Sequence, residues 1–595
     1  MKALRHLNKY FINYKMSLII GFLFVACSNV FGILSAQVIR FSVDLINEYI
    51  QLFQLYLGTD VIHKILIDII TVSLFAFSAL YLIFHLIKGS FMFLMRQTII
   101  VTSRKIEYDL KNEVFTHFQA LPLSFFKQNH TGDLMTRITE DVTRVRMYAG
   151  PALMYTMNLI TLFIITISIM MFVNIELSIY ALTPLPILSF LIYKVSSVMY
   201  KKGEKIQNTL SNLATISQEV FSGIRVVKSY GRSQKFQSLF KEESEDYHIK
   251  SMELAKVESL FFPLMTLLIG LSTILIILIG GKQVISGKIT YGNIVEFVYY
   301  INLLTWPVTA IGWIASLYQR AKVSQGRINQ FLETPVQDLN EHGIKHDING
   351  SIEFKNVHFT YPETGIAAIQ GLDLKIEEGQ KVAIVGKTGS GKTSIANLLL
   401  KFYNPNEGGT ILLDDKPLND FAIKPYRDQI GYVSQDVFLF SDTIKNNINF
   451  GLKQSTEDEL KKYIKIAELE KDIDQFSDGL DTKIGERGIS LSGGQKQRIT
   501  IARALIRNPK LLIFDDCLSS VDANTEFNIF KNLNEETQGK TALIITHRVL
   551  SLNKMDQIIV LESGKIKEAG SFDQLIENKA TFYGLYQKQK LEESA

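Results

Sequence analysis

One segment of the chain has residue types and spacing that prescribe a ligand: Lys381–Phe402, KVAIVGKTGSGKTSIANLLLKF. It reads as a short apolar strand, then a glycine-rich loop, then a helix that continues from Ser394. Glycines let a phosphate approach the backbone closely, and the N–H groups at a helix N-terminus point at the anion. The sequence therefore predicts a phosphate-binding loop. The residues expected to bind the phosphates are Gly386, Lys387, Thr388, Gly389, Ser390, Gly391, Lys392, Thr393 and Ser394.

Two side chains of this loop have more specific predicted roles. Lys392 can neutralise the outer phosphates of a nucleotide, and the Thr393 hydroxyl is placed to bind Mg²⁺. A glycine-rich turn without a ligand is the competing interpretation of so short a match considered alone. The strand–loop–helix setting and the motifs downstream favour a phosphate site.

The apolar runs of the chain are concentrated in its first half. At 595 residues the chain is too long for one hydrophobic core, so two or more domains are expected. Uncharged runs before Arg320 each approach the ~20 residues that a membrane-spanning helix needs, and nothing comparable follows. We expect a transmembrane domain at 1–320, a linker at 321–350 and a soluble domain at 351–595. The six expected spans are about Met16–Ile39, Ile65–Leu94, Tyr148–Val173, Leu177–Val198, Ser259–Ile279 and Tyr291–Tyr318.

Charge predicts how these parts are oriented in the membrane. The residues up to the first span carry Lys2, Arg5, Lys9 and Lys15 and no acid, which indicates a cytoplasmic N-terminus. The first apolar run is too long for a signal peptide, so we expect it to remain as a span. Six spans return the chain to the same side, so the phosphate-binding half is expected in the cytoplasm. The net charge of +4 is small for this length and gives no reason to invoke nucleic acid.

Polar residues inside the spans leave more than one interpretation open. Ser28 and Asn29 can contact a substrate, but polar side chains in membrane helices usually bond to neighbouring helices, and we favour that interpretation. His85 and Lys88 lie near the inner end of the second span, which favours snorkelling of Lys88 to the interface. Glu296 is the best intramembrane carboxylate for a functional role, and an ordinary interfacial role fits it equally.

A second anion-binding pattern lies in the soluble half. Leu491–Gln495, LSGGQ, joins a serine hydroxyl, two glycine N–H groups and a predicted helix start, which together make an anion nest. Because the chain already has one phosphate loop, the second nest predicts a nucleotide held by another copy of the domain, and hence a dimer. Nearby, one apolar strand ends in Asp515 and Asp516, and another ends beside His547.

These motifs, together with Tyr361, Gln435 and Asp522, occur in the order and spacing of an ATP-binding-cassette (ABC) domain. The whole chain resembles an ABC exporter half-transporter, and segments near 121–132 and 219–231 resemble the two coupling helices of that family. The resemblance implies an all-α six-helix transmembrane domain followed by an α/β P-loop NTPase cassette domain. It also implies ATP and Mg²⁺ at the site.

The resemblance assigns a role to each candidate residue. Tyr361 would stack on adenine, and Asp515 would hold Mg²⁺ directly or through water. Gln435 would reach Mg²⁺ or the attacking water, and His547 would reach the γ-phosphate. Asp516 stands where the family has its catalytic glutamate and is one methylene shorter, which puts the rate of hydrolysis in doubt. The implied catalytic set is Lys392, Gln435, Asp516 and His547, and the residues implied at a partner's nucleotide are Ser492, Gly493, Gly494 and Gln495.

The implied function is ATP-driven export or flipping of an amphipathic or hydrophobic substrate, either lipid or drug-like, by alternating access. A homodimer in the lipid bilayer of a bacterial inner membrane is favoured. One alternative is that the chain forms half of a heterodimer with one weakened ATP site, and another is that it exports a peptide. Six spans exclude a soluble cassette protein. A gated channel is disfavoured because the chain lacks long regulatory insertions, and an importer because membrane and cassette parts are fused here.

Overall fold

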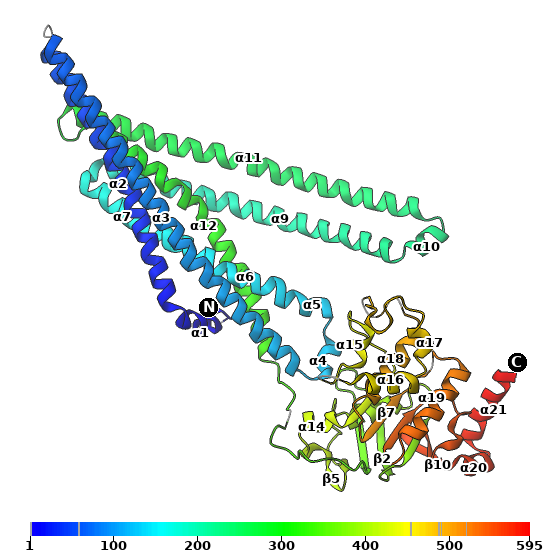
Figure 1. The fold of residues 1–595 in the computed structure, drawn as a ribbon. Coiled ribbons are helices and arrows are strands. Elements are labelled where there is room, and N and C mark those ends of the chain that lie inside the picture. The colour runs from blue at the N-terminus through cyan, green and yellow to red at the C-terminus, as the bar shows by residue number, and fades with distance from the viewer. Residues whose placement is uncertain are drawn as a thin grey trace. The chain divides into compact units, whose positions relative to one another are not determined.

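The structure is a computed structural model that describes residues 3–56, 60–338, 340–452, 455–485, 488, 491–518 and 520–594. Internal contacts divide the chain into two units (Figure 1). The helical unit comprises Met1–Gln119 and Gly132–Thr334, and the α/β unit comprises Ala120–Thr131 and Pro335–Ala595. A short stretch between two long helices therefore belongs, by its contacts, to the α/β unit.

The described part of the helical unit has six helical runs that are long and apolar enough to cross a membrane, as the six uncharged runs predict. They are 41 to 61 residues long. About 20 residues span a hydrocarbon core, so each run extends well beyond it. The six are α2 (Lys15–Leu55), α3 (Asp60–Ala120), the run that ends in α7 (Leu153–Val173), the pair α8 (Ile175–Leu182) and α9 (Pro184–Ser222), α11 (Ser233–Ile285) and α12 (Tyr291–Leu332). The shorter helices are η1 (Ala3–Leu7), α1 (Asn8–Asn13), α4 (Leu123–Gln128), α5 (Thr131–Thr136), η2 (Arg137–Asp141), α6 (Val142–Met147), η3 (Tyr148–Ala152) and α10 (Ile224–Ser229).

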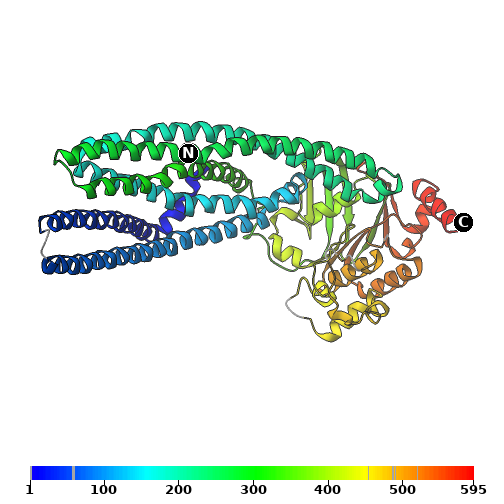
Figure 2. The ribbon, with the colours of Figure 1, turned by 90° about the horizontal axis from the view of Figure 1, so that it is seen from above.

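Helix α12 supplies much of the core of the helical unit. Its Phe297 and Tyr300 are fully buried and belong to the same apolar cluster as Ile33 of α2 and Leu162 and Met170 of α7. Helices α9 and α11 lie side by side along their length (Figures 1 and 2). The turn between these two helices contains α10.

The α/β unit is built on two sheets. The smaller is antiparallel with strand order β2-β1-β4-β5, and the larger has the order β10-β9-β3-β8-β7-β6. All strands of the larger sheet are parallel except β10, which pairs antiparallel with β9. The strands are β1 (Ile352–Thr360), β2 (Ala367–Ile376), β3 (Lys381–Val385), β4 (Thr410–Leu413), β5 (Lys416–Pro417), β6 (Ile430–Val433), β7 (Leu511–Asp515), β8 (Thr541–Ile545), β9 (Gln557–Glu562) and β10 (Lys565–Gly570). The helices are α13 (Lys392–Leu399), η4 (Leu418–Asp420), α14 (Ile423–Asp428), α15 (Ile444–Ile448), α16 (Glu457–Ile466), α17 (Glu470–Ile473), η5 (Gly479–Asp481), α18 (Gly493–Leu505), α19 (Ala523–Glu536), η7 (Leu552–Lys554), α20 (Phe572–Glu577) and α21 (Thr581–Ser594).

The centre of the larger sheet is apolar on both faces. Every residue of β7 and β8 is buried, as continuous apolar runs in a parallel sheet require. Strands β3, β8, β7 and β6 are neighbours, so the loops that follow them meet at one edge. In doubly wound sheets, ligands bind at this carboxyl edge. It is also where the sequence has its glycine-rich loop, His547, Asp516 and Gln435.

Helix α4 packs within the α/β unit. Leu123 packs against the core cluster formed by the smaller sheet and α13, and the Gln337 N–H donates to the carbonyl of Ala120 at 2.8 Å. Pro122 separates two helices, because α3 ends at Ala120 and α4 begins at Leu123. The first of the two segments that resemble coupling helices is thus held by apolar packing and a backbone hydrogen bond.

Candidate nucleotide-binding site

A pocket of about 240 Å³ lies at the carboxyl edge of the larger sheet. It is lined by side chains from the ends of three parallel strands and from the start of α13. The predicted site residues that line it are Tyr361, Thr388, Gly389, Gly391, Lys392, Thr393, Ser394, Gln435, Asp515, Asp516 and His547. The fold therefore brings together residues that are up to 186 positions apart in the chain, from Tyr361 to His547.

The loop between β3 and α13 needs its glycines. Gly386, Gly389 and Gly391 have φ angles of 155°, 81° and 101°, which L side chains rarely adopt. A Cβ at Gly386 would lie 2.2 Å from the carbonyl oxygen of Leu561, and one at Gly391 would lie 2.4 Å from that of Ala368. Other residues at these positions would displace the loop from the strands beside it.

Lys392 closes the loop on itself. Its Nζ donates to the carbonyl oxygens of Gly386 at 2.9 Å and Lys387 at 3.0 Å. Burial lowers the pKa of the Lys392 ammonium, and the nearby carboxylates of Asp516 and Asp515 oppose that shift. The ammonium is held among loop carbonyls, from which it can turn to a phosphate oxygen without leaving the loop.

The side chains of Thr393 and Asp515 fit a divalent cation. Thr393 Oγ1 donates to Asp515 Oδ1 at 3.1 Å, and the other carboxylate oxygen, Oδ2, is buried with no hydrogen-bond partner among the described residues. Burial raises the pKa of Asp515 to about 6. A hydroxyl and a carboxylate with a free oxygen are the ligands that Mg²⁺ takes beside phosphates. Gln435 lines the same pocket and can complete the set.

Asp516 and His547 follow adjacent strands. Asp516 has a φ of 45°, and its N–H donates to the carbonyl of Ile545 at 2.8 Å, which fixes the residue at the end of β7. Burial lowers the pKa of His547, the Lys392 charge adds to this effect, and Asp516 opposes it. Burial and the Lys392 charge thus favour the neutral imidazole.

Comparison with known proteins identifies the family. The model of the ABC transporter transmembrane region matches residues 18–308, and the ABC transporter model matches residues 369–519. A probable multidrug resistance ABC transporter ATP-binding/permease protein of Bacillus subtilis, YheI, is 37% identical over 490 residues, which cover 82% of this chain and 83% of the relative. The chain belongs to the ABC transporter family.

Other relatives of this ABC transporter include a multidrug resistance-like ATP-binding protein of Escherichia coli, MdlA, at 33% identity over 82% of this chain and 83% of the relative. An ATP-dependent lipid A-core flippase of Hahella chejuensis is 32% identical over 83% of this chain and 84% of the relative. A bacterial Atm1-family ABC exporter solved with ATP bound shares the fold, with a TM-score of 0.76, 23% identity and 98% of each chain covered. The protein is a multi-pass membrane ATPase of the exporter type, with membrane and ATP-binding domains fused in one chain.

The Tyr361 ring of the ABC transporter is held on several sides. Its hydroxyl lies 3.0 Å from Ser394 Oγ and accepts from Asn397 Nδ2 at 3.2 Å, which ties the ring to α13. Tyr403 meets it edge-on, with ring centroids 5.3 Å apart. The Lys127 ammonium of α4 lies 5.1 Å from the ring centroid. The ring is thereby fixed beside the phosphate loop.

The LSGGQ motif does not line the pocket that the described residues form. Ser492 is the N-cap of α18: the Gln495 N–H donates to Ser492 Oγ at 3.2 Å, and Gln495 Oε1 accepts from the Ser492 N–H at 2.9 Å. Gly493 and Gly494 pack against Ser520, so a Cβ on either would lie within 3.3 Å of it. The motif is thus an ordered helix start away from the chain's own phosphate loop, and Asp522 similarly caps α19 through Thr525.

Glu296, the intramembrane carboxylate singled out in the sequence, is fully buried and paired. It accepts from Tyr300 Oη at 2.8 Å and Asn293 Nδ2 at 3.2 Å, and it lies 3.6 Å from the guanidinium of Arg40. The contact with Arg40 joins α12 to α2. The structure therefore gives Glu296 a position in a helix-to-helix contact.

One residue that supports the site carries no motif signal in the sequence. Gln589 of α21 donates through Nε2 to the carbonyl of His547 and accepts from the Val549 N–H at 2.8 Å. It thus holds the loop that presents the imidazole. A glutamine in a polar C-terminal helix gives no indication of such a contact, because only the fold brings the two segments together.

Proposed function

We propose that this protein uses ATP hydrolysis at the strand-edge pocket to export or flip an amphipathic or hydrophobic molecule, lipid or drug-like, across a bacterial inner membrane. The observation that carries the proposal is that Lys392, Thr393, Asp515, Asp516 and His547 line one pocket, in a chain that also has six membrane-length helices. Relatives named as multidrug and lipid A-core transporters support this class of cargo.

Each residue of the pocket has a proposed task in hydrolysis. Tyr361 stacks on the base, and Lys392 and the loop N–H groups bind the phosphates. Thr393, Asp515 and Gln435 would hold Mg²⁺, which when bound neutralises charge on the β- and γ-phosphate oxygens. Asp516 accepts a hydrogen bond from the water that attacks the γ-phosphorus, and neutral His547 donates to a γ-phosphate oxygen. The bond to the β–γ bridging oxygen breaks, leaving ADP and inorganic phosphate.

A second chain completes each site in this proposal. Ser492, Gly493, Gly494 and Gln495 would bind the γ-phosphate held by the partner's loop, so ATP draws two α/β units together. A homodimer is the favoured form, and its N-terminus and α/β unit face the cytoplasm. A heterodimer remains the second candidate because Asp516 is shorter than the family's glutamate.

Transmission to the membrane is proposed to run through α4 and α10. Lys127 of α4 lies over the Tyr361 ring and 3.9 Å from Glu363, whose carboxylate also accepts from Tyr403 Oη at 2.6 Å. Movement of the α/β units would therefore displace α4 and, with it, the long helix α3 before it and the short helix α5 after it. The helical unit would change from inward-facing to outward-facing, and hydrolysis would reset it.

The ATPase activity of the purified chain in lipid tests the chemical part of this proposal. Lys392→Ala removes the cation that offsets phosphate charge, so turnover should fall by at least ~10²-fold. Lys424→Ala is the matched control, because Lys424 lies on α14 with its side chain 90% exposed. Equal activity of Lys392→Ala and Lys424→Ala would exclude hydrolysis at this pocket. Stimulation by lipids, peptides and hydrophobic ions then narrows the cargo.

A further inference from the structure

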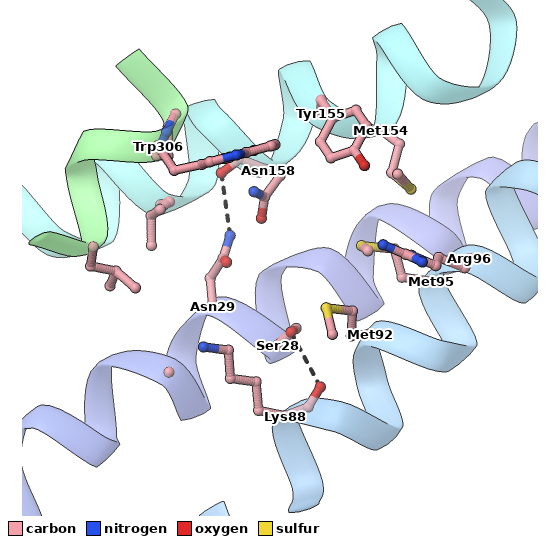
Figure 3. A pocket seen from close by; sticks show the side chains of 14 residues that line it. Ser28, Asn29, Lys88, Met92, Met95, Arg96, Met154, Tyr155, Asn158 and Trp306 are labelled. Carbon is pink, nitrogen blue, oxygen red and sulfur yellow. Dashed lines mark hydrogen bonds between the residues drawn. The ribbon is translucent and has the colours of Figure 1, made fainter. Parts of the chain in front are cut away.

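A cavity of about 350 Å³ lies within the helical unit between α2, α3, α7 and α12 (Figure 3). Its lining combines apolar side chains with two cations, Lys88 and Arg96, both on α3. The described residues that line it include no aspartate or glutamate. The cavity is therefore apolar in its walls and positive in its charge.

Lys88 faces this cavity. A Cβ at Gly32 of α2 would lie 3.2 Å from Lys88 Nζ, so the absence of a side chain at Gly32 makes room for the ammonium. Figure 3 shows the ammonium directed toward α2, beside Asn29. The sequence favoured snorkelling of Lys88 to the interface, but the space at Gly32 lets the side chain lie against the neighbouring helix instead.

The Lys88 ammonium has no hydrogen bond or ion pair with another described residue. Ser28 Oγ donates to the backbone carbonyl of Lys88 at 3.3 Å, and this bond does not involve Nζ. Arg40 of α2 differs, because it lies beside both Asp44 and Glu296. A charged group in apolar surroundings is unfavourable unless it is paired, so a bound anion would stabilise Lys88.

Two polar side chains of the wall, Ser28 and Asn29, already bond to neighbouring helices. Asn29 Nδ2 donates to Thr161 Oγ1 at 2.7 Å and to the carbonyl of Asn158 at 3.3 Å, which ties α2 to α7. The prediction that polar residues of the first span bond to neighbouring helices is confirmed for Asn29. The charged donors that remain for a ligand are therefore Lys88 and Arg96, beside the neutral side chains of Tyr155 and Asn158.

The α3 face that carries the cations is continuous. Lys88, Met92, Met95 and Arg96 have the i, i+4, i+7, i+8 spacing that places side chains on one side of a helix. The two cations are thus separated by ~12 Å along the axis, with two methionines between them. Methionine is flexible and polarisable and adapts to apolar ligands of different shape. Trp306 adds a flat apolar surface on the opposite side.

We infer that this cavity binds an amphiphile with an anionic group, which pairs with Lys88 while its apolar body lies against Met92, Met95 and Trp306. This inference names the substrate class for the proposed export function and rests on it. The anion can belong to a lipid head group or to a free amphiphile, since a phosphate, carboxylate or sulfonate presents the same chemistry to an ammonium. Amphiphilic cations are disfavoured, because both charged groups of the wall repel them.

The test is a binding measurement on the full-length protein in phosphatidylcholine nanodiscs without ATP. The chain has two tryptophans, so Trp313→Phe leaves Trp306 as the fluorescent reporter inside the cavity. The probes are tetraphenylborate and tetraphenylphosphonium, which have nearly the same size and apolar surface and opposite charge. The inference requires saturable quenching by the anion at a Kd at least ~10-fold below that of the cation. Equal or tighter binding of the cation overturns it.

Variants locate the charge that matters. Lys88→Gln should weaken tetraphenylborate binding by about 10-fold, because the charged interaction with the anion is lost. Lys88→Arg should restore the binding, because arginine keeps the positive charge. Lys105→Gln is the control, since Lys105 lies on the same helix, is exposed and does not line the cavity. Unchanged anion binding in Lys88→Gln overturns the inference even if the wild type prefers the anion.

Lipid composition distinguishes the two sources of anion. If phosphatidylglycerol in the nanodisc competes with tetraphenylborate, the ligand is an anionic lipid; if it does not, a free anionic amphiphile is the ligand. Because binding is read without ATP, its failure is separable from failure of the export proposal. If the protein binds the anion but does not transport with ATP, the export proposal is refuted and the anion preference stands. If the protein transports but binds both ions equally, the anion preference is refuted and the export proposal stands.

Discussion

Thr393 and Asp515 are joined across the pocket by a hydrogen bond of 3.1 Å from the threonine hydroxyl to Asp515 Oδ1. The two residues are 122 positions apart and come from the start of α13 and the end of β7. Asp515 Oδ2 is buried and has no hydrogen-bond partner among the described residues. This pair therefore offers a hydroxyl and a free carboxylate oxygen at one point, beside the phosphate loop.

The first prediction concerns that pair. Asp515→Asn keeps the shape of the side chain and removes its charge, so the Mg²⁺ concentration for half-maximal ATPase activity should rise by at least about 10-fold. The measurement is a Mg²⁺ titration at saturating ATP. Asp415→Asn, at an exposed aspartate that does not line the pocket, serves as the control. An unaltered Mg²⁺ requirement in Asp515→Asn would remove Asp515 from the metal site.

The second prediction concerns the shorter acid, Asp516. Relative to glutamate it loses about 1.5 Å of reach, a displacement that can reduce the rate by ~10²-fold. In a homodimer, the chain expressed alone hydrolyses ATP slowly, Asp516→Glu matches or exceeds it, and Asp516→Asn nearly abolishes it. Steady-state ATPase rates of the three proteins make the comparison.

The alternative for Asp516 is a heterodimer. In that case the wild-type chain alone is as inactive as Asp516→Asn, and Asp516→Glu restores hydrolysis. This result would contradict the homodimer and would require a partner chain with a glutamate at the corresponding position. The N-cap at Ser492 and the His547 loop held by Gln589 mean that the rest of this chain's machinery is intact, which favours the homodimer.

The third prediction concerns Gln589, which bonds to the carbonyl of His547 and the N–H of Val549. Gln589→Ala frees the loop that carries the imidazole, so kcat should fall about 10-fold while the KM for ATP changes little. Lys590→Ala, at an exposed neighbour on the same helix, should behave as wild type. A change in KM alone would indicate that α21 supports nucleotide binding and not the position of His547.

Some parts of this site were predictable from sequence, because their signals lie in adjacent residues of the chain. The strands before Gly386, Asp516 and His547 are buried on both faces, so they appear as continuous apolar runs, and the motif follows each run directly. Gln589 was not predictable, because its contact with His547 depends on how α21 packs. The direction of Lys88 depends on a glycine of another helix, which no pattern within its own span reveals.

The fourth prediction tests the dimer. In a chain whose Cys27 and Cys517 are replaced, Lys387→Cys and Ser492→Cys should crosslink between chains when ATP and vanadate trap the closed state. Both positions are exposed, and Ser492 does not line the chain's own pocket. The product should run at twice the mass of one chain on a denaturing gel. Crosslinks confined to single chains would count against a shared site.

ATP-driven movement of an amphiphile by the purified protein is the direct test of export. Proteoliposomes that contain a fluorescent NBD-labelled phospholipid, or the dye Hoechst 33342, receive ATP and Mg²⁺ from outside, and the movement of each probe across the bilayer is followed by fluorescence. We expect ATP-dependent movement of at least one probe with wild type and Lys424→Ala, and none with Lys392→Ala. Movement at the wild-type rate with Lys392→Ala, or ATP hydrolysis by wild type without movement of either probe, would contradict it.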